Sequence, residues 1–309
     1  MRVATFAFAE LVANTIIPPY MKKTLAYLPK HKADELELIK NIILEKIPDV
    51  RMIILFGSYA RGEAVEDIHT EGHTTHVYQS DFDILVATKD KKTAEDFNAH
   101  DRVEKAIAAT DKVHTPYSII YHYFGYVRQM VINGHYFFTD IKKEGIQLYL
   151  KKGKYNLGKI KKLTPSERQK IAKEDFKLWF KKAKVFYRQY ENAVRMREYK
   201  NAAFQLHQAV ECFYSAITLV FINYRFRTHD IELLGIKAVG YDPEFAKAFP
   251  QDTQPHRRAF TLLKRAYVDA RYKKDYKITK KQLEYLAERV KVLQRLTKKI
   301  CGAKIKSFI

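Results

Sequence analysis

Two short stretches of the sequence combine a tight turn with side chains that suit phosphate and metal chemistry. The stretch FGSYARG directly follows the apolar run RMIIL and places Gly57 and Ser58 at a turn. About twenty residues later, the stretch SDFDILV places Asp81 and Asp83 one residue apart, at the start of a second apolar run. Because side chains alternate along a strand, the two aspartates should share one face while their apolar neighbours point into the core.

Paired carboxylates of this kind indicate a cation site. Two carboxylates a few ångströms apart repel each other unless a cation lies between them, and Mg²⁺ prefers carboxylate and phosphate oxygens. Gly57 would let the backbone approach a ligand, and Ser58 would offer a hydroxyl and a backbone N–H to phosphate. Arg61 would add a positive charge. The alternative is a simple turn followed by an exposed strand edge.

The apolar pattern around these motifs predicts an N-terminal domain in which helices and strands alternate. Helices are expected over residues 1–20, 31–47 and 94–110, and strands over 51–56, 82–87 and 115–123. Residues 134–141 are expected to form a fourth strand or a strand-to-turn segment. This order predicts an α+β domain with a mixed sheet and flanking helices.

The second half of the chain has helical periodicity throughout. A long polar-aromatic helix is expected over residues 166–199, and helices with apolar stripes are expected over 201–223, 257–272 and 279–299. The Lys- and Gly-containing stretch before the helix-start sequence TPSE marks the boundary. The predicted organisation is a first domain at 1–150, a basic linker at 151–165 and an all-α bundle at 166–309.

Positive charge is concentrated in that second half. The chain has a net charge of +21, yet residues 1–150 hold 18 basic and 20 acidic side chains. Residues 151–309 hold the remaining 38 basic and 15 acidic side chains. This asymmetry predicts a polyanionic partner for the second half, such as nucleic acid or nucleotide phosphate, unless the charges only solvate a helical surface.

Composition also limits the class of protein. The sequence has no apolar run of about 18 residues, so no membrane span or membrane partner is expected. Cys212 and Cys301 are the only cysteines, too few for a disulfide framework or a zinc cluster. Both observations favour a cytoplasmic protein.

The motifs resemble two known families. FGSYARG and SDFDILV resemble the signature of DNA-polymerase-β-type nucleotidyltransferases, in particular the small bacterial type. In the second half, NAAFQLHQAVE, THDIELL and AYVDARY resemble a HEPN helical bundle. The order of the two halves resembles bacterial nucleotidyltransferase–HEPN fusions, and also the kanamycin nucleotidyltransferase arrangement, in which a helical domain completes the active site.

The resemblance implies a transferase that moves a nucleoside monophosphate from a nucleoside triphosphate, with ATP as the default, to a hydroxyl group. Asp81 and Asp83 would hold two Mg²⁺ ions, and Gly57 and Ser58 would bind the β- and γ-phosphates with help from Arg61. The acceptor is left open between a small molecule, a protein and RNA. Proteins of both families often form pairs, so the resemblance also allows a homodimer.

The sequence departs from the transferase pattern at the third acidic residue, which many members carry on a later strand. The expected strand TPYSIIYHY contains no Asp or Glu, and only Ser118 or His122 could lie near that place. Glu211 in the helical half is the candidate general base; its alternative is a carboxylate paired with Arg or Lys. Because the third acidic residue is missing, catalysis could also be weakened. The alternative function is then a nucleotide- or RNA-binding regulatory protein of toxin–antitoxin type.

The sequence also departs from the HEPN ribonuclease pattern, in which an Arg precedes a His by a few residues. No His follows Arg265 or Arg271, so a self-contained HEPN nuclease is not expected. Arg265, Asp269, Arg271 and Tyr272 either face a nucleotide or the other domain, or form a salt-bridge network.

Five histidines have simpler explanations than catalysis or metal binding. His69, His73 and His76 lie in a polar stretch that is expected to be an exposed loop or hairpin. His207 lies on an apolar helix and is expected to be a buried, hydrogen-bonded side chain. His229 belongs to THD, which is expected to cap a helix.

Overall fold

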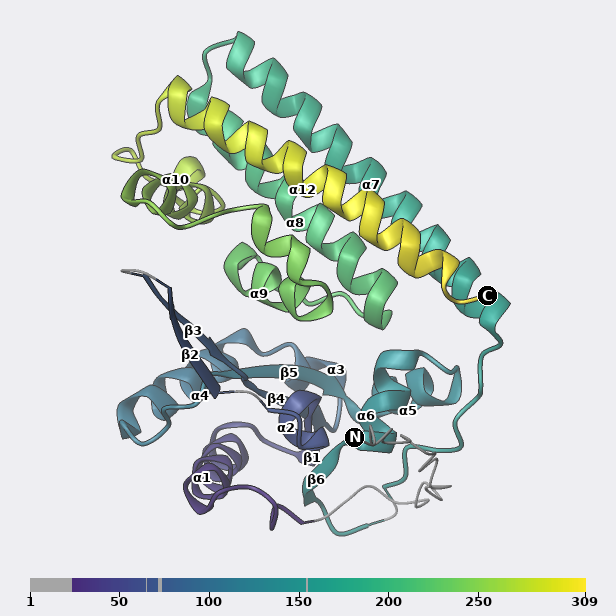
Figure 1. Cartoon of the computed structure of the whole chain (residues 1–309). Coiled ribbons are helices and arrows are strands. Elements are labelled where there is room, and N and C mark those ends of the chain that lie inside the picture. Colours follow the sequence, from purple (N-terminus) through teal and green to yellow (C-terminus); the bar gives the residue numbers. More distant parts are fainter. Residues whose placement is uncertain (1–23, 65, 72–73, 154) are drawn as a thin grey trace, which may run out of the picture. The chain divides into compact units, whose positions relative to one another are not determined.

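Strands and helices alternate through the first half of the computed structural model and only helices follow, as Figure 1 shows. The structure describes residues 24–64, 66–71, 74–153 and 155–309. The expected helix over residues 1–20 therefore lies outside the described residues. The described elements confirm the predicted α+β class.

Contacts divide the chain into two compact units. Unit 1 comprises the described residues within 1–71, 75–132 and 138–159. Unit 2 comprises those within 72–74, 133–137 and 160–309.

Unit 1 is organised around a mixed sheet of four strands in the order β5–β4–β1–β6 (Figure 1). The strands are β1 (Val50–Phe56), β4 (Phe82–Thr88), β5 (Tyr117–Tyr123) and β6 (Ile146–Leu150). β1 pairs antiparallel with β4 and β6, whereas β4 pairs parallel with β5. β1 and β4 are the two central strands and are buried on both faces, which explains their continuous apolar sequences.

One face of the sheet is covered by α1 (Lys30–Lys46) and α4 (Phe97–Thr110). Their side chains pack with strand side chains into one cluster, which includes Leu36, Ile39, Ile43, Val103, Ile107, Ile53, Leu55, Ile84 and Val86. The buried residues recur three or four positions apart along each helix and two positions apart along each strand. Both predicted helices are confirmed.

The opposite face meets α5 (Phe124–Ile132) and α6 (Tyr136–Glu144). The expectation of a fourth strand over residues 134–141 is wrong, because this segment is mostly helix α6 and the fourth strand is β6. The aromatic run YFF favours a strand by propensity. The helix instead buries most of its first six residues, namely Tyr136, Phe137, Phe138, Thr139 and Ile141.

Three further elements of unit 1 are short. They are α2 (Gly57–Arg61), α3 (Lys91–Ala94) and the separate two-stranded sheet of β2 (Glu66–Glu71) and β3 (Thr74–Gln79). This sheet confirms the hairpin predicted for the polar stretch before Asp81. The side chains of His69, His73 and His76 lie outside the described residues.

Unit 2 is a helical bundle (Figure 1). Its elements are α7 (Pro165–Arg195), α8 (Tyr199–Ile222), α9 (Ile231–Tyr241), the 3₁₀ helix η1 (Pro243–Lys247), α10 (Gln254–Arg265), α11 (Asp269–Tyr272) and α12 (Lys280–Lys306). The predicted stripe on α8 is confirmed, because its members are fully buried: Leu206, Val210, Phe213, Ile217 and Val220. Gln169 bonds to Ile305 and Tyr190 bonds to Leu283, so α7 and α12 run antiparallel.

Two predicted helices of unit 2 are interrupted. The stretch expected as one helix over 257–272 divides into α10 and α11, because residues 266–268 form a turn. The long helix expected to reach residue 199 ends at Arg195, and Arg197 has a φ of 60° before α8 begins. Among the described residues, no helix is long and apolar enough to cross a membrane.

Candidate functional site

The turn after β1 brings the backbone of Gly57 against the side chain of Asp83. Gly57 begins α2 with a φ of 77°, a conformation that favours glycine. A Cβ atom at this position would overlap Oδ2 of Asp83 and would lie 3.1 Å from its Cγ. The structure therefore brings the Gly-Ser turn and the second aspartate together.

The strand register explains this contact. Phe56, the last residue of β1, pairs with Asp83 across the antiparallel ladder. On its other side, Asp83 pairs with Ser118 of β5. The sheet therefore brings the end of β1 and the beginnings of β4 and β5 to one edge.

Asp81 lies immediately before β4, two residues from Asp83, and both aspartates are half-buried. Phe82 between them is fully buried, as is Ile84, so the predicted alternation is confirmed. The backbone N–H of Phe82 donates to the carbonyl of Pro116 at 2.8 Å, which fixes the start of β4 beside the segment that enters β5.

The other two residues predicted to bind phosphate lie on α2. Ser58 is half-buried directly after Gly57. Arg61 is exposed, and its Nε lies 2.6 Å from Glu63 while a terminal nitrogen lies 3.7 Å from Glu144. Arg61 would have to exchange these carboxylates for phosphate in order to act as a clamp.

The strand register shows which position on β5 lacks the third acidic residue of the transferase pattern. Ser118 occupies the β5 position beside Asp83, and β5 carries no carboxylate. His122 is paired further along with Ala87 and stacks on Tyr126 at 4.8 Å. Within the part of the chain that the structure describes, no group of three or more His, Cys, Asp or Glu side chains could hold a metal ion. Two carboxylates alone still suit Mg²⁺, which commonly completes its shell with water and substrate phosphate.

Lys32 is a neighbour of this region that sequence reasoning missed. Its side chain is only 6% exposed, its Nζ donates to Oγ1 of Thr115 at 2.7 Å, and it lies 6.0 Å from the ring centre of Tyr59. Glu35 accepts from the backbone N–H of Thr115 at 3.1 Å. The available signal was the position of Lys32 and Glu35 on the apolar stripe of α1, one turn before Leu36 and Ile39.

A second polar cluster lies within unit 2 and contains Glu211. Oε2 of this carboxylate lies 2.8 Å from Nδ1 of His229, and Nε2 of His229 lies 2.7 Å from the hydroxyl of Tyr267. The His229 and Tyr267 rings also stack at 3.8 Å. If Nδ1 carries the proton, it donates to Glu211 while Nε2 accepts from Tyr267. Glu211 is 7% exposed, and its charge partner is this histidine rather than Lys or Arg.

Two flanking residues match simpler expectations. His207 is fully buried beside the cluster, with its Nδ1 3.0 Å from the carbonyl of Leu263, and burial lowers its pKa. The predicted helix cap is confirmed at Asp230, which accepts from two backbone N–H groups of the first turn of α9. His229, one residue earlier, is thereby directed toward Glu211.

The four predicted residues of the late bundle fall into two groups. Asp269 is buried between Lys273 and Arg265, at 3.1 Å and 2.6 Å, and both cations hold the pKa of its carboxyl below the usual range. Arg271 and Tyr272 are exposed instead. The guanidinium of Arg271 lies over three aromatic rings, at 4.5 Å from Tyr267, 4.9 Å from Tyr272 and 5.0 Å from Phe204.

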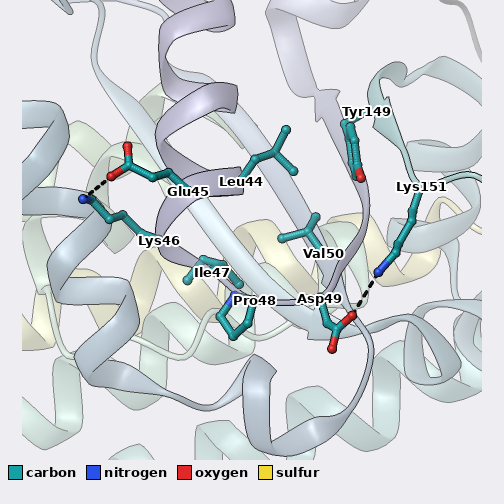
Figure 2. Close-up of a pocket in the computed structure, with 9 residues that line it drawn as sticks. All are labelled: Leu44, Glu45, Lys46, Ile47, Pro48, Asp49, Val50, Tyr149 and Lys151. Carbon is teal, nitrogen blue, oxygen red and sulfur yellow. Dashed lines mark hydrogen bonds and ion pairs between the residues drawn. The ribbon is translucent and has the colours of Figure 1, made fainter.

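A pocket of about 330 Å³ in unit 1 is separate from the aspartates. Figure 2 shows it between the end of α1, the start of β1 and the end of β6, with the ion pair of Asp49 and Lys151 at its rim. Because Gly57 follows the opposite end of β1, this pocket does not belong to the Gly57–Asp83 edge of the sheet.

Comparison with known proteins identifies part of the chain. A search of curated proteins gives no significant match. Residues 176–300, from within α7 to within α12, match the family model described as HEPN domain. The helical C-terminal region of this chain is therefore similar to a HEPN domain.

Proposed function

We propose that unit 1 catalyses nucleotidyl transfer, moving a nucleoside monophosphate from a nucleoside triphosphate, ATP by default, to a hydroxyl group of an acceptor. The observation that supports this most strongly is the packing of Gly57 against Asp83. This contact joins a turn that can approach phosphate to a carboxylate that can hold a cation. The mixed sheet and its register are compatible with a polymerase-β-type fold.

Each residue has a defined task in this proposal. Gly57 leaves room for the Asp83 carboxylate beside the turn, and Ser58 donates hydrogen bonds to a phosphate of the nucleotide. Asp81 and Asp83 are the ligands for two Mg²⁺ ions, which when bound neutralise the triphosphate and help the pyrophosphate to leave. The half-buried aspartates keep their orientation because Phe82 is anchored in the core. The acceptor is a small molecule, a protein or RNA.

The test supplies purified protein with Mg²⁺, each α-labelled nucleoside triphosphate in turn, and a cell extract as the source of acceptors. Label should move to a discrete acceptor. Asp83→Asn should reduce the transfer at least about 100-fold, because it removes a metal ligand. Asp101→Asn is the matched control, since Asp101 is exposed on α4 and pairs only with Lys105 in the described chain. Full activity of Asp83→Asn would contradict the metal assignment.

The second candidate function is nucleotide or RNA binding by a regulatory protein with weakened catalysis. It is favoured by the aromatic and cationic face of Arg271 and Tyr272, next to the Glu211–His229–Tyr267 cluster, and by the absence of a carboxylate from β5. Glu211 could serve as a general base only after releasing His229.

Nucleotide binding with and without a chelator separates the two functions. The transferase requires Mg²⁺ for productive triphosphate binding and depends on Asp83. The regulator would bind equally well in chelator and in Asp83→Asn, and would lose affinity in Tyr272→Ala, whose side chain is 72% exposed and whose removal leaves the bundle core intact.

A further inference from the structure

The outward side of α7 carries a row of cations. With about 100° of rotation per residue, eight of its positions between Lys170 and Arg195 fall within a sector of about 80°. Seven of the eight hold Lys or Arg and the eighth holds Glu191. The seven cations, called here the α7 cation row, are Lys170, Lys173, Lys177, Lys181, Lys184, Arg188 and Arg195, and all are exposed.

The charge of this row is not neutralised within the described residues. None of the seven cations forms an ion pair there; Lys173 and Arg195 bond only to the neutral side chains of Gln169 and Asn192. Three of the exposed lysines on α12 behave differently. Lys280, Lys291 and Lys299 pair with Glu284, Glu288 and Glu244.

We propose that the α7 cation row binds the phosphate backbone of a double-stranded nucleic acid. The row extends over the 26 residues from Lys170 to Arg195, or about 37 Å at a rise of about 1.5 Å per residue. This length corresponds to about 11 base pairs of duplex. Five of the seven cations are lysines, which act as point charges toward phosphate rather than as forked readers of base edges.

The same face disfavours other anionic partners. Single strands are usually held by aromatic side chains on which bases stack, and the row contains none. A helix that binds a membrane surface inserts its apolar face into lipid. The apolar side of α7 is already buried in the bundle, through Ala172, Ala183, Tyr187, Tyr190 and Ala193. The exposed apolar side chains beside the row are Leu178 and Val185 alone among the described residues of α7.

The test compares two triple variants of the full chain. Lys177→Gln, Lys181→Gln and Lys184→Gln together remove the centre of the row. Lys280→Gln, Lys291→Gln and Lys299→Gln together remove the same charge from paired lysines of the same bundle. Fluorescence anisotropy measures binding to RNA and DNA duplexes of about 20 base pairs at several salt concentrations between about 50 and 200 mM.

Wild-type protein should bind duplex with a steep salt dependence. The row variant should bind at least about tenfold more weakly at low salt, and the slope of log K against log salt should fall by about 2.7, or about 0.9 per lost phosphate contact. The α12 variant should change each value much less. Replacing the same three row lysines by arginine should preserve binding.

Four results would overturn the proposal. They are no duplex binding by wild type at low salt, equal loss in the two triple variants, equal or tighter binding of a single strand of the same length, and preferential binding of phosphatidylserine vesicles or polyglutamate. The proposal is independent of nucleotidyl transfer, so the duplex affinity of Asp83→Asn should equal that of wild type even if unit 1 proves inactive.

Discussion

Gly57 requires glycine for two separable reasons. Its φ of 77° is costly for any residue with a side chain, and its missing Cβ makes room for the carboxylate of Asp83. Gly62, five residues later, has nearly the same φ of 78°, but the nearest atoms to a Cβ there would be ring carbons of Tyr27 at 3.9 Å. The two glycines therefore share the backbone requirement and differ in the contact.

Gly57→Ala should abolish triphosphate binding, because the added methyl group must displace Asp83. Gly62→Ala is the matched control: it should cost about 1 kcal/mol or more of stability from backbone strain and keep binding intact. Calorimetric titration with Mg²⁺ and ATP, together with urea unfolding of both variants, measures the two effects. Equal loss of binding in both variants would assign the effect to strain alone and remove Asp83 from the site.

At the scale of elements, the sequence predicts those helices, strands and turns that depend on hydrophobic periodicity and local turn chemistry. The apolar runs before Gly57 and after Asp81 predict β1 and β4, and alternation predicts that Phe82 is buried; both are confirmed. The segment that begins at Tyr136 could not be assigned this way, because three adjacent aromatic residues suit a strand by propensity. In the structure these three aromatic residues are all buried in a helix, so their tertiary packing overrides the strand propensity.

Sequence spacing also could not predict contacts between distant elements. The cluster around Glu211 requires His229, 18 residues later, and Tyr267, 38 residues after that. Only the packing of α8, the turn before α9 and the segment after α10 brings these side chains together. The capping role predicted for this turn is correct, but it accounts for Asp230 and not for His229.

The first turn of α7 is fixed by reciprocal hydrogen bonds within the helix-start sequence TPSE. Oγ1 of Thr164 accepts from the backbone N–H of Glu167 at 3.2 Å, and the Glu167 carboxylate accepts from the backbone N–H of Thr164 at 2.8 Å. Thr164→Ala should lower the free energy of unfolding by about 1 kcal/mol, whereas Thr164→Ser should restore it. Urea unfolding measures both. Equal stability of the Ala variant and wild type would mean that packing alone sets the start of α7.

At the scale of the whole molecule, the sequence predicts which half of the chain carries the excess positive charge. It does not predict which surface of that half carries it. The excess of cations in residues 151–309 indicates an anionic partner without indicating a surface. The structure adds which side of α7 is buried and which lysines elsewhere are neutralised by glutamates. Together these facts place seven unneutralised cations on one line along α7.

The two proposed sites lie in different units, so their ligands should stabilise the protein independently. Mg²⁺ with ATP at about 100 times its Kd should stabilise the binding unit by about 2.7 kcal/mol, and a duplex at the same excess should do likewise. Asp83→Asn should lose the thermal shift with ATP and keep the shift with duplex. The triple glutamine variant at Lys177, Lys181 and Lys184 should show the reverse. Loss of both responses in either variant would mean that nucleotide and duplex share one site, because a residue in one independent site cannot remove binding at the other.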